Sequence, residues 1–99
     1  MRLVWTPLVW TPRAVRDLAS ARAYIAQDNP AASVKQVERV LRAVATLLQF
    51  PEIGRPGRRA GTRELVVSRT PFLVAYRLRG DAIELLAVLH GRQRWPEAF

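Results

Sequence analysis

Ten residues in the second half of the chain have side chains suited to binding a polyanion. They form two basic segments, one before residue 64 and one after residue 89, with two further arginines between these segments. The set comprises Arg55, Arg58, Arg59, Arg63, Arg77, Arg79, His90, Arg92, Arg94 and Trp95. A guanidinium group binds a phosphate or a carboxylate through two parallel hydrogen bonds, which a lysine ammonium group does not. We therefore expect these residues to define the working surface, with a partner that carries phosphates or carboxylates.

The charge of the whole chain points to the same class of partner. Sixteen basic residues stand against eight acidic ones, a formal net charge of +8 at pH 7, and all the basic residues except Lys35 are arginine. Such a field favours nucleic acid or an acidic protein. The arginine codons of a GC-rich genome are an alternative explanation of the Arg/Lys ratio, but they do not explain the net charge.

The sequence carries no motif for a metal, a cofactor or a membrane span. It has no cysteine and one histidine, so disulfides and thiolate ligation are excluded. Gly54, Gly57 and Gly61 do not precede a predicted helix, as the glycines of a phosphate-cradling loop do. No apolar run approaches the ~20 residues of a membrane helix, and the first residues lack the apolar region of a signal peptide. We therefore expect no cofactor, no bound metal, no membrane contact and a cytoplasmic location.

Two amphipathic helices are predicted in the first half of the chain. Thr11-Pro12 and Asn29-Pro30 each combine a capping residue with a proline suited to the first helical position. Apolar residues then recur at helical spacing, namely Ala14, Leu18, Ala21 and Ile25 in the first helix and Val34, Val37, Leu41, Val44 and Leu48 in the second. The first helix should end near residue 26, with Arg13, Arg16, Asp17, Ser20 and Gln27 on its solvent side. A short joint makes the pair an antiparallel hairpin.

Four strands are predicted around these helices. Residues 8–10 form the first, after residues 1–7, which carry one copy of a duplicated LVWTP pentapeptide. Residues 63–68, 72–79 and 82–89 form the others, and residues 51–62 are a loop. The order β-α-α-β-β-β predicts one α+β domain over residues 1–99, in which the helical hairpin covers one face of a mainly antiparallel four-stranded sheet. The alternation in residues 72–79 places Tyr76 in the core and Arg77 and Arg79 on the open face; residues 92–99 form a tail.

An ordered set of short motifs resembles the RelE/ParE superfamily of bacterial toxins. The motifs are residues 24–30 (YIAQDNP), 50–57 (FPEIGRPG), 61–67 (GTRELVV), 70–72 (TPF) followed by Tyr76 and Arg77, and 88–91 (VLHG) followed by Arg92 and Trp95. The resemblance runs from about Trp10 to Pro96 and implies the RelE-like fold. It also implies the toxin of a type II toxin–antitoxin pair, neutralised by a cognate antitoxin of the ParD-like ribbon-helix-helix kind, whose C-terminal segment wraps along the toxin. An acidic antitoxin would complement the +8 charge.

The resemblance leaves two activities and a weaker third. ParE-like members inhibit DNA gyrase and have no demonstrated nuclease centre, and this is the activity we expect; RelE-like members cleave mRNA in the ribosome. For a metal-independent nuclease, Arg63 and Arg77 resemble phosphate-binding arginines, and His90 resembles a C-terminal general acid. Structural roles are the alternatives: a hydrogen-bonded His90, an edge charge at Arg63, a Trp95 packed over the sheet and a solvated loop. A non-toxic nucleic-acid-binding module is the third possibility.

Overall fold

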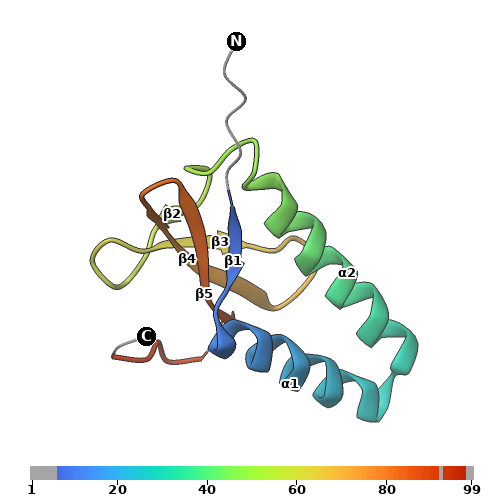
Figure 1. The fold of residues 1–99 in the computed structure, drawn as a ribbon. Helices are drawn as coiled ribbons and strands as arrows, with labels where there is room; N and C mark the ends of the chain where they lie inside the picture. Colours follow the sequence, from blue (N-terminus) through green and yellow to red (C-terminus); the bar gives the residue numbers. More distant parts are fainter. Residues whose placement is uncertain (1–6, 92, 98–99) are drawn as a thin grey trace.

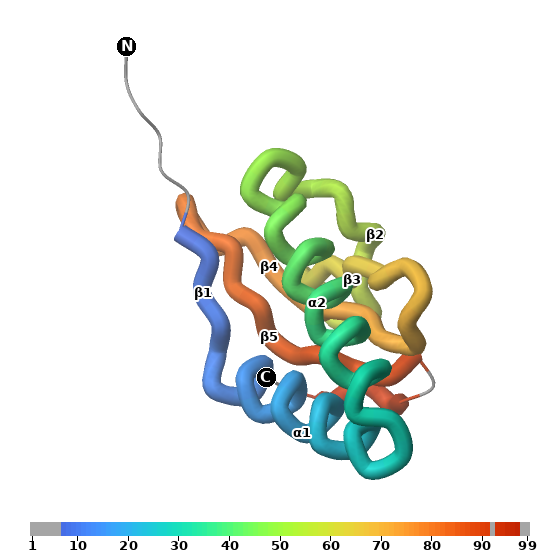
Figure 2. Tube along the Cα trace, turned by 90° about the vertical axis from the view of Figure 1, so that its right-hand side faces the viewer, coloured from blue at the N-terminus to red at the C-terminus, as the bar shows by residue number. Residues whose placement is uncertain are grey.

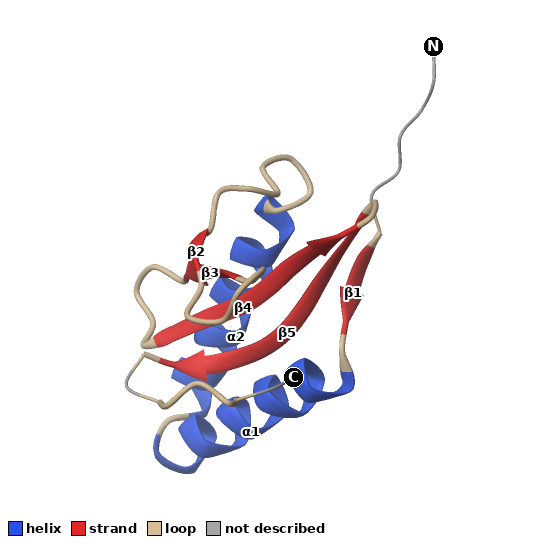
Figure 3. Cartoon of the chain, turned by 90° about the vertical axis from the view of Figure 1, so that its left-hand side faces the viewer, coloured by secondary structure: helices blue, strands red, loops and turns tan. Residues whose placement is uncertain are grey.

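The computed structural model describes residues 7–91 and 93–97 of the chain. In chain order the elements are β1 (Leu8–Trp10), α1 (Pro12–Asp28), α2 (Pro30–Thr46), β2 (Arg55–Pro56), β3 (Arg63–Val66), β4 (Phe72–Arg79) and β5 (Ala82–His90) (Figure 1). The two helices form a hairpin on one side of the sheet (Figure 2), and the strands face the viewer from the other side (Figure 3). The predicted α+β class and the order of its elements are confirmed. The first copy of the duplicated pentapeptide lies almost wholly outside the described residues.

The helix boundaries follow from the capping residues that the sequence supplies. The Thr11 hydroxyl accepts a hydrogen bond from the Ala14 backbone nitrogen (3.3 Å) and donates one to the Leu85 carbonyl oxygen (2.7 Å). Asn29 ends α1 and begins α2, because its backbone N–H donates to the Ile25 carbonyl (2.9 Å) while its side chain accepts from the Ala32 N–H (3.0 Å). One asparagine therefore caps both helices, and α1 runs two residues further than predicted.

The sheet has five strands, so the prediction of four was wrong. The strand order is β1-β5-β4-β3-β2, with β1 parallel to β5 and the other neighbours antiparallel. The extra strand, β2, comes from the segment predicted as a loop. There the Gly57 N–H donates to the Thr62 carbonyl (2.8 Å), which closes residues 57–62 into a hairpin and brings Arg55 opposite Glu64. A proline at position 56 is tolerated because β2 lies at the edge of the sheet.

An irregularity in the β4–β5 ladder decides which way the end of β5 faces. Ala75 pairs with Ala87, but Tyr76 pairs with Leu85, so Leu86 is an extra residue in β5. Such a β-bulge reverses the alternation of side chains beyond it. Before the bulge the odd-numbered residues of β5, such as Ile83 and Leu85, face the helices. After the bulge an even-numbered residue, Val88, faces them.

Two apolar clusters stabilise the domain, one on each face of the sheet. The larger lies beneath the helices and includes Val40, Val44, Leu47, Val74 and Tyr76, as predicted for Tyr76. The smaller lies on the opposite face and consists of Leu73, Ala75, Leu86, Ala87, Leu89 and Trp95. The face predicted to be open is thus partly covered by the tail, which leaves Arg77 and Arg79 at its uncovered end. No helix in the described part of the chain is long and apolar enough to cross a membrane.

Candidate functional site

Arg63 fastens the loop that follows α2 to the sheet. Its Nη1 donates to two backbone carbonyls, those of Glu52 (3.0 Å) and Gly54 (2.9 Å). Arg63 stands opposite Tyr76 in the β3–β4 ladder, so it lies on the helix-facing side of the sheet. The guanidinium group therefore already donates hydrogen bonds to the protein's own backbone, and fewer of its N–H groups remain for a ligand.

The Tyr76 hydroxyl completes this attachment from inside the core. It donates to the Pro51 carbonyl (2.8 Å) and accepts from the Gly54 N–H (2.8 Å). Burial raises the pKa of Tyr76 above its ordinary value, and this effect outweighs the Gly54 hydrogen bond and the Arg63 charge, which act in the opposite direction. A neutral phenol whose hydroxyl already has two backbone partners serves to hold the loop and is poorly placed to transfer protons to a substrate.

The loop held by Arg63 and Tyr76 presents apolar side chains to solvent. Phe50 is 58% exposed and Ile53 is 57% exposed, and together with Pro51 and Glu52 they line an open hollow of about 370 Å³. Single exposed apolar residues are common, but a rigidly attached cluster is typical of a protein contact. This cluster was not predicted from the sequence, although Phe50 and Ile53, on either side of Pro51 and Glu52, were a visible signal.

The arginines on the opposite face of the sheet are largely paired with carboxylates. Arg77 Nε lies 2.8 Å from Glu84 Oε1, and Arg79 Nη1 lies 3.9 Å from the same oxygen. Arg55 Nε lies 2.6 Å from Oε1 of Glu64, a residue only 5% exposed. These pairs reduce the positive field that the sequence suggested for this face. They also give Arg55 and Arg77 structural partners.

Arg58 and Arg59 hold the C-terminal tail. Arg59 Nε donates to the Pro96 carbonyl (2.9 Å) and its Nη2 to the Trp95 carbonyl (3.5 Å). The Arg58 guanidinium lies 5.8 Å from the centre of the Trp95 ring, within the range of a cation–π contact. Trp95 is buried against the sheet. Part of the basic loop is thus used to attach the tail; Arg94 is exposed, and Arg92 lies outside the described residues.

The three residues expected to form a nuclease centre lie in three different places. Arg63 is on the helix-facing side opposite Tyr76, and Arg77, the next residue in β4, points to the other face. His90 stands opposite Phe72 at the far end of β4, and its ring packs edge-on to that of Phe72, with 6.1 Å between centroids. The alternation in β4 therefore puts Arg77 on the face opposite Arg63. The bulge in β5 puts His90 on the helix-facing side with Arg63, but four positions away from it along β4. Among the described residues there is also no group of three or more metal-ligating side chains of the His, Cys, Asp or Glu type.

The outer surface of the helical hairpin carries an apolar groove. It has a volume of about 290 Å³, lies between α1 and α2 beside β1, and is lined by Trp10, Val15, Leu18, Ala19, Arg22, Val37 and Leu41. Val15 and Leu41 expose about half of their surface. Since β1 is the last strand of the described sheet, its outer edge and this groove form one continuous surface. Such a surface can receive a partner's amphipathic helix or an added strand.

Comparisons with known proteins give this fold and these motifs a family. Residues 8–95 match the family model described as the ParE toxin of the type II toxin–antitoxin system parDE. The chain is 44% identical over 90 residues to the putative toxin Y4kP of Sinorhizobium fredii, which covers 91% of this chain and 93% of that protein. It is 35% identical over 83 residues to the toxin RelE2 of Caulobacter vibrioides, covering 84% of this chain and 92% of that toxin.

Solved structures agree with these sequence matches. A chain of the chromosomal ParDE system of P. aeruginosa superposes with a TM-score of 0.80 at 28% identity, covering 86% of this chain and 95% of that one. A chain of the RelBE2 toxin–antitoxin complex of Mycobacterium tuberculosis has the same fold, with a TM-score of 0.62 at 24% identity, covering 88% of this chain and 99% of that one. The chain therefore belongs to the ParE toxin family of type II toxin–antitoxin systems, within the RelE/ParE superfamily.

Proposed function

We propose that this toxin arrests growth in the cytoplasm by inhibiting DNA gyrase rather than by cutting RNA, and thereby stabilises the plasmid or chromosome that encodes it. The observation that supports this proposal is the separation of Arg63, Arg77 and His90 by the strand register. A nuclease of the expected kind needs phosphate-binding and proton-transferring groups around one reacting phosphate. The described residues offer no such cluster, whereas the rigid loop with Phe50 and Ile53 suits contact with a protein target.

We further propose that a cognate antitoxin neutralises the toxin along the groove between α1 and α2 and the free edge of β1. The groove is apolar apart from Arg22, and it lies on a protein of net charge +8. An acidic segment that contains an amphipathic helix, followed by an extended stretch, would match both properties. A ParD-like ribbon-helix-helix protein with such a C-terminal half is the expected partner.

A gyrase supercoiling assay with the purified toxin tests the proposed target. Supercoiling should fall with increasing toxin, and added antitoxin should restore it. The test variant is Ile53→Asp, which places a charge on the exposed loop and should weaken inhibition. The control is Asp81→Asn in the exposed β4–β5 turn, which should have no effect. Gyrase that stays fully active at saturating toxin would reject the proposal.

Cleavage of mRNA in the ribosome is the second candidate, the activity implied by the resemblance to RelE-like members; one relative of this chain is named toxin RelE2. In that case expression of the toxin should produce codon-phased cuts in translated mRNA. The cuts should disappear with Arg63→Ala or His90→Ala. Intact transcripts during growth arrest would exclude this activity, and unaffected growth on expression alone would leave only the third reading, a non-toxic nucleic-acid-binding module.

A further inference from the structure

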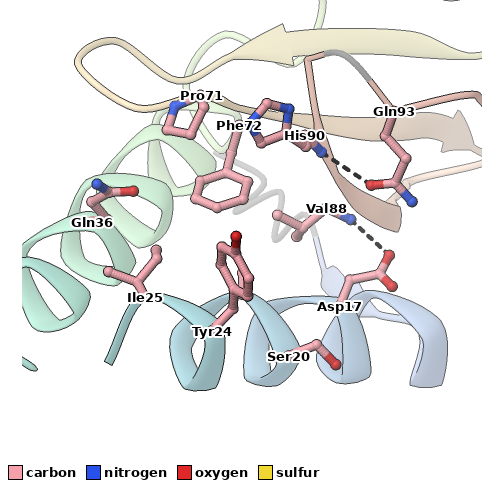
Figure 4. A pocket seen from close by; sticks show the side chains of 11 residues that line it. Asp17, Ser20, Tyr24, Ile25, Gln36, Pro71, Phe72, Val88, His90 and Gln93 are labelled. Carbon is pink, nitrogen blue, oxygen red and sulfur yellow. Dashed lines mark hydrogen bonds between the residues drawn. The ribbon is translucent and has the colours of Figure 1, made fainter. Parts of the chain in front are cut away.

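A second groove, unrelated to the one between the helices, opens between α1 and the ends of β4 and β5. Its volume is about 380 Å³. Figure 4 shows Tyr24, Phe72 and His90 around a common space, with Gln36 on one side and Asp17 on another. The proposed gyrase and antitoxin contacts do not use this groove, although His90, the candidate general acid of a nuclease, lines it.

Two acceptors of this groove belong to Gln36 and Asp17. Gln36 Oε1 is buried and has no hydrogen-bond partner among the described residues. The Asp17 carboxylate is half-buried, although Asp17 was predicted on the solvent side of the first helix. Its Oδ2 accepts from the Val88 N–H (3.1 Å) and lies 3.5 Å from Arg13 Nε, because the bulged end of β5 packs against α1. A buried acceptor without a donor is unfavourable, so a ligand that donates hydrogen bonds would be stabilised here.

Three of the side chains that line the groove are aromatic, namely Tyr24, Phe72 and His90. Tyr24 is 75% exposed on α1 and lies across from Phe72 of β4, and the Phe72 ring contacts the His90 ring edge-on. Aromatic faces carry negative partial charge and attract cations, especially the flat guanidinium group. No arginine or lysine lines the described part of this groove, although the chain carries sixteen such residues. The groove therefore differs in character from the basic surface around it.

We propose that this groove binds one arginine side chain of the antitoxin, which stacks on Tyr24 and Phe72 and donates to Gln36 Oε1 and to the Asp17 carboxylate. The inference rests on the proposed toxin–antitoxin pairing. Arginine fits better than lysine because its planar fork can stack and donate at the same time. A nucleic acid is a poorer occupant, since its phosphates would meet Asp17 with no cation in the described lining. The basic surface can attract acidic residues of the antitoxin at many points. A single site that accepts a cation would fix the register, because only one alignment of the antitoxin would place its arginine there.

The test begins with small probes that do not require the antitoxin. Propylguanidinium and its neutral isostere propylurea are titrated separately into the ¹⁵N-labelled full chain. We expect propylguanidinium to shift the amide signals of Tyr24, Val88 and the Gln36 side chain, with propylurea binding about tenfold more weakly. Equal binding of the two probes, or shifts elsewhere on the protein, would overturn the proposal. Binding of cytidine or adenosine at these same signals without binding of propylguanidinium would replace it with a nucleobase site.

Two variants locate the interaction. Gln36→Met removes the acceptor, and Asp17→Asn removes the charge but keeps an oxygen for the Val88 N–H; each should weaken propylguanidinium about tenfold. The matched controls are Gln49→Met and Asp81→Asn at exposed positions, which should leave the affinity unchanged. If Gln36 is only an unfavourable buried amide, Gln36→Met will raise the melting temperature and leave probe binding intact, which would contradict the proposal.

The last experiment measures binding of the antitoxin itself. Each arginine in the antitoxin's C-terminal half is replaced by methionine, and the affinities are measured with wild-type toxin and with the Asp17→Asn toxin. One arginine should be coupled to Asp17, so that the double change costs less than the sum of the two single changes. An antitoxin that binds without any such coupling would refute the arginine site alone, whereas no binding at all would refute the proposed pairing and leave the probe results standing.

Discussion

The hydroxyl oxygen of Tyr76 lies 2.8 Å from the backbone nitrogen of Gly54, and a β-carbon at position 54 would come within 2.6 Å of the same tyrosine side chain. Glycine is therefore needed at position 54 so that the chain can approach the tyrosine, and the tyrosine in turn supplies that backbone N–H with its acceptor. Together they fix the end of the loop that exposes Phe50 and Ile53. The most direct predictions concern this pair.

Replacing Tyr76 by phenylalanine should lower the free energy of unfolding by about 2 kcal/mol. The change keeps the ring in the core but leaves the Pro51 carbonyl and the Gly54 N–H without their buried partner. Urea denaturation followed by circular dichroism measures the effect. Tyr24→Phe is the matched control, because Tyr24 is exposed, and it should change stability by less than about 0.5 kcal/mol. Equal effects of the two substitutions would show that the buried hydroxyl bonds contribute nothing.

Gly54→Ala should also cost about 2 kcal/mol, here through steric overlap with the tyrosine ring. The nearest atoms are the ring carbon Cε1 as well as the hydroxyl oxygen, so Gly54→Ala should remain destabilising when it is combined with Tyr76→Phe. Denaturation of the single and double variants measures this. Full recovery of stability in the double variant would mean that the hydroxyl alone causes the overlap.

Stability should decrease at alkaline pH in a way that depends on Tyr76. Burial raises its pKa in the folded state above the ordinary tyrosine value of 10.0, so the folded protein holds this proton more tightly than the unfolded chain does. The resulting stabilisation is complete below pH 10.0 and is lost as the pH rises from there through the folded-state pKa. Denaturation curves between pH 8 and 11.5 should show a shallower decrease for Tyr76→Phe than for the wild type. Parallel curves would contradict this assignment.

Removing the Trp95 side chain should destabilise the domain by about 3 kcal/mol, as for other buried aromatic residues. Trp95→Ala uncovers Leu73, Leu86 and Leu89 on the face opposite the helices and removes the ring contacted by Arg58. Thermal denaturation measures the loss, and binding of a hydrophobic dye should increase. Arg94→Ala, at a neighbouring exposed position, should have neither effect.

The affinity of the proposed antitoxin should fall with increasing salt, since charge complementarity between an acidic segment and a +8 protein is screened by ions. Calorimetric titrations between 50 mM and 500 mM NaCl provide the measurement. Leu41→Asp, in the groove between the helices, should weaken binding at every salt concentration. A flat salt response would indicate that apolar contacts alone determine the affinity.

Much of the fold follows from local signals in the sequence. The capping residues Thr11 and Asn29 and the prolines after them set both helices, and the alternation in β4 placed Tyr76 in the core. These features depend on neighbours a few positions away, which a sequence displays directly.

The site was harder to predict because it depends on pairing between distant segments. The bulge at Leu86 is a property of the β4–β5 ladder, and it decides on which side of the sheet His90 lies. Arg59 finds its acceptors in the tail, at positions 95 and 96, and Asp17 finds its donor in β5. Likewise β2 is a strand only because β3 lies beside it. In each case the arginine or acid was visible in the sequence, but its partner was set by tertiary structure.

The central place of β5 has a consequence for how the toxin unfolds. This strand pairs with β1 on one side and with β4 on the other, and the bond from Thr11 to Leu85 joins positions 74 residues apart. When β5 leaves, β1 loses its partner in the sheet and β4 loses one of its two neighbours, so unfolding should occur as one cooperative transition. Contacts that distant also slow folding, since the chain must close a long loop before they form. A partner bound beside β1 would therefore stabilise contacts between segments that are far apart in the sequence.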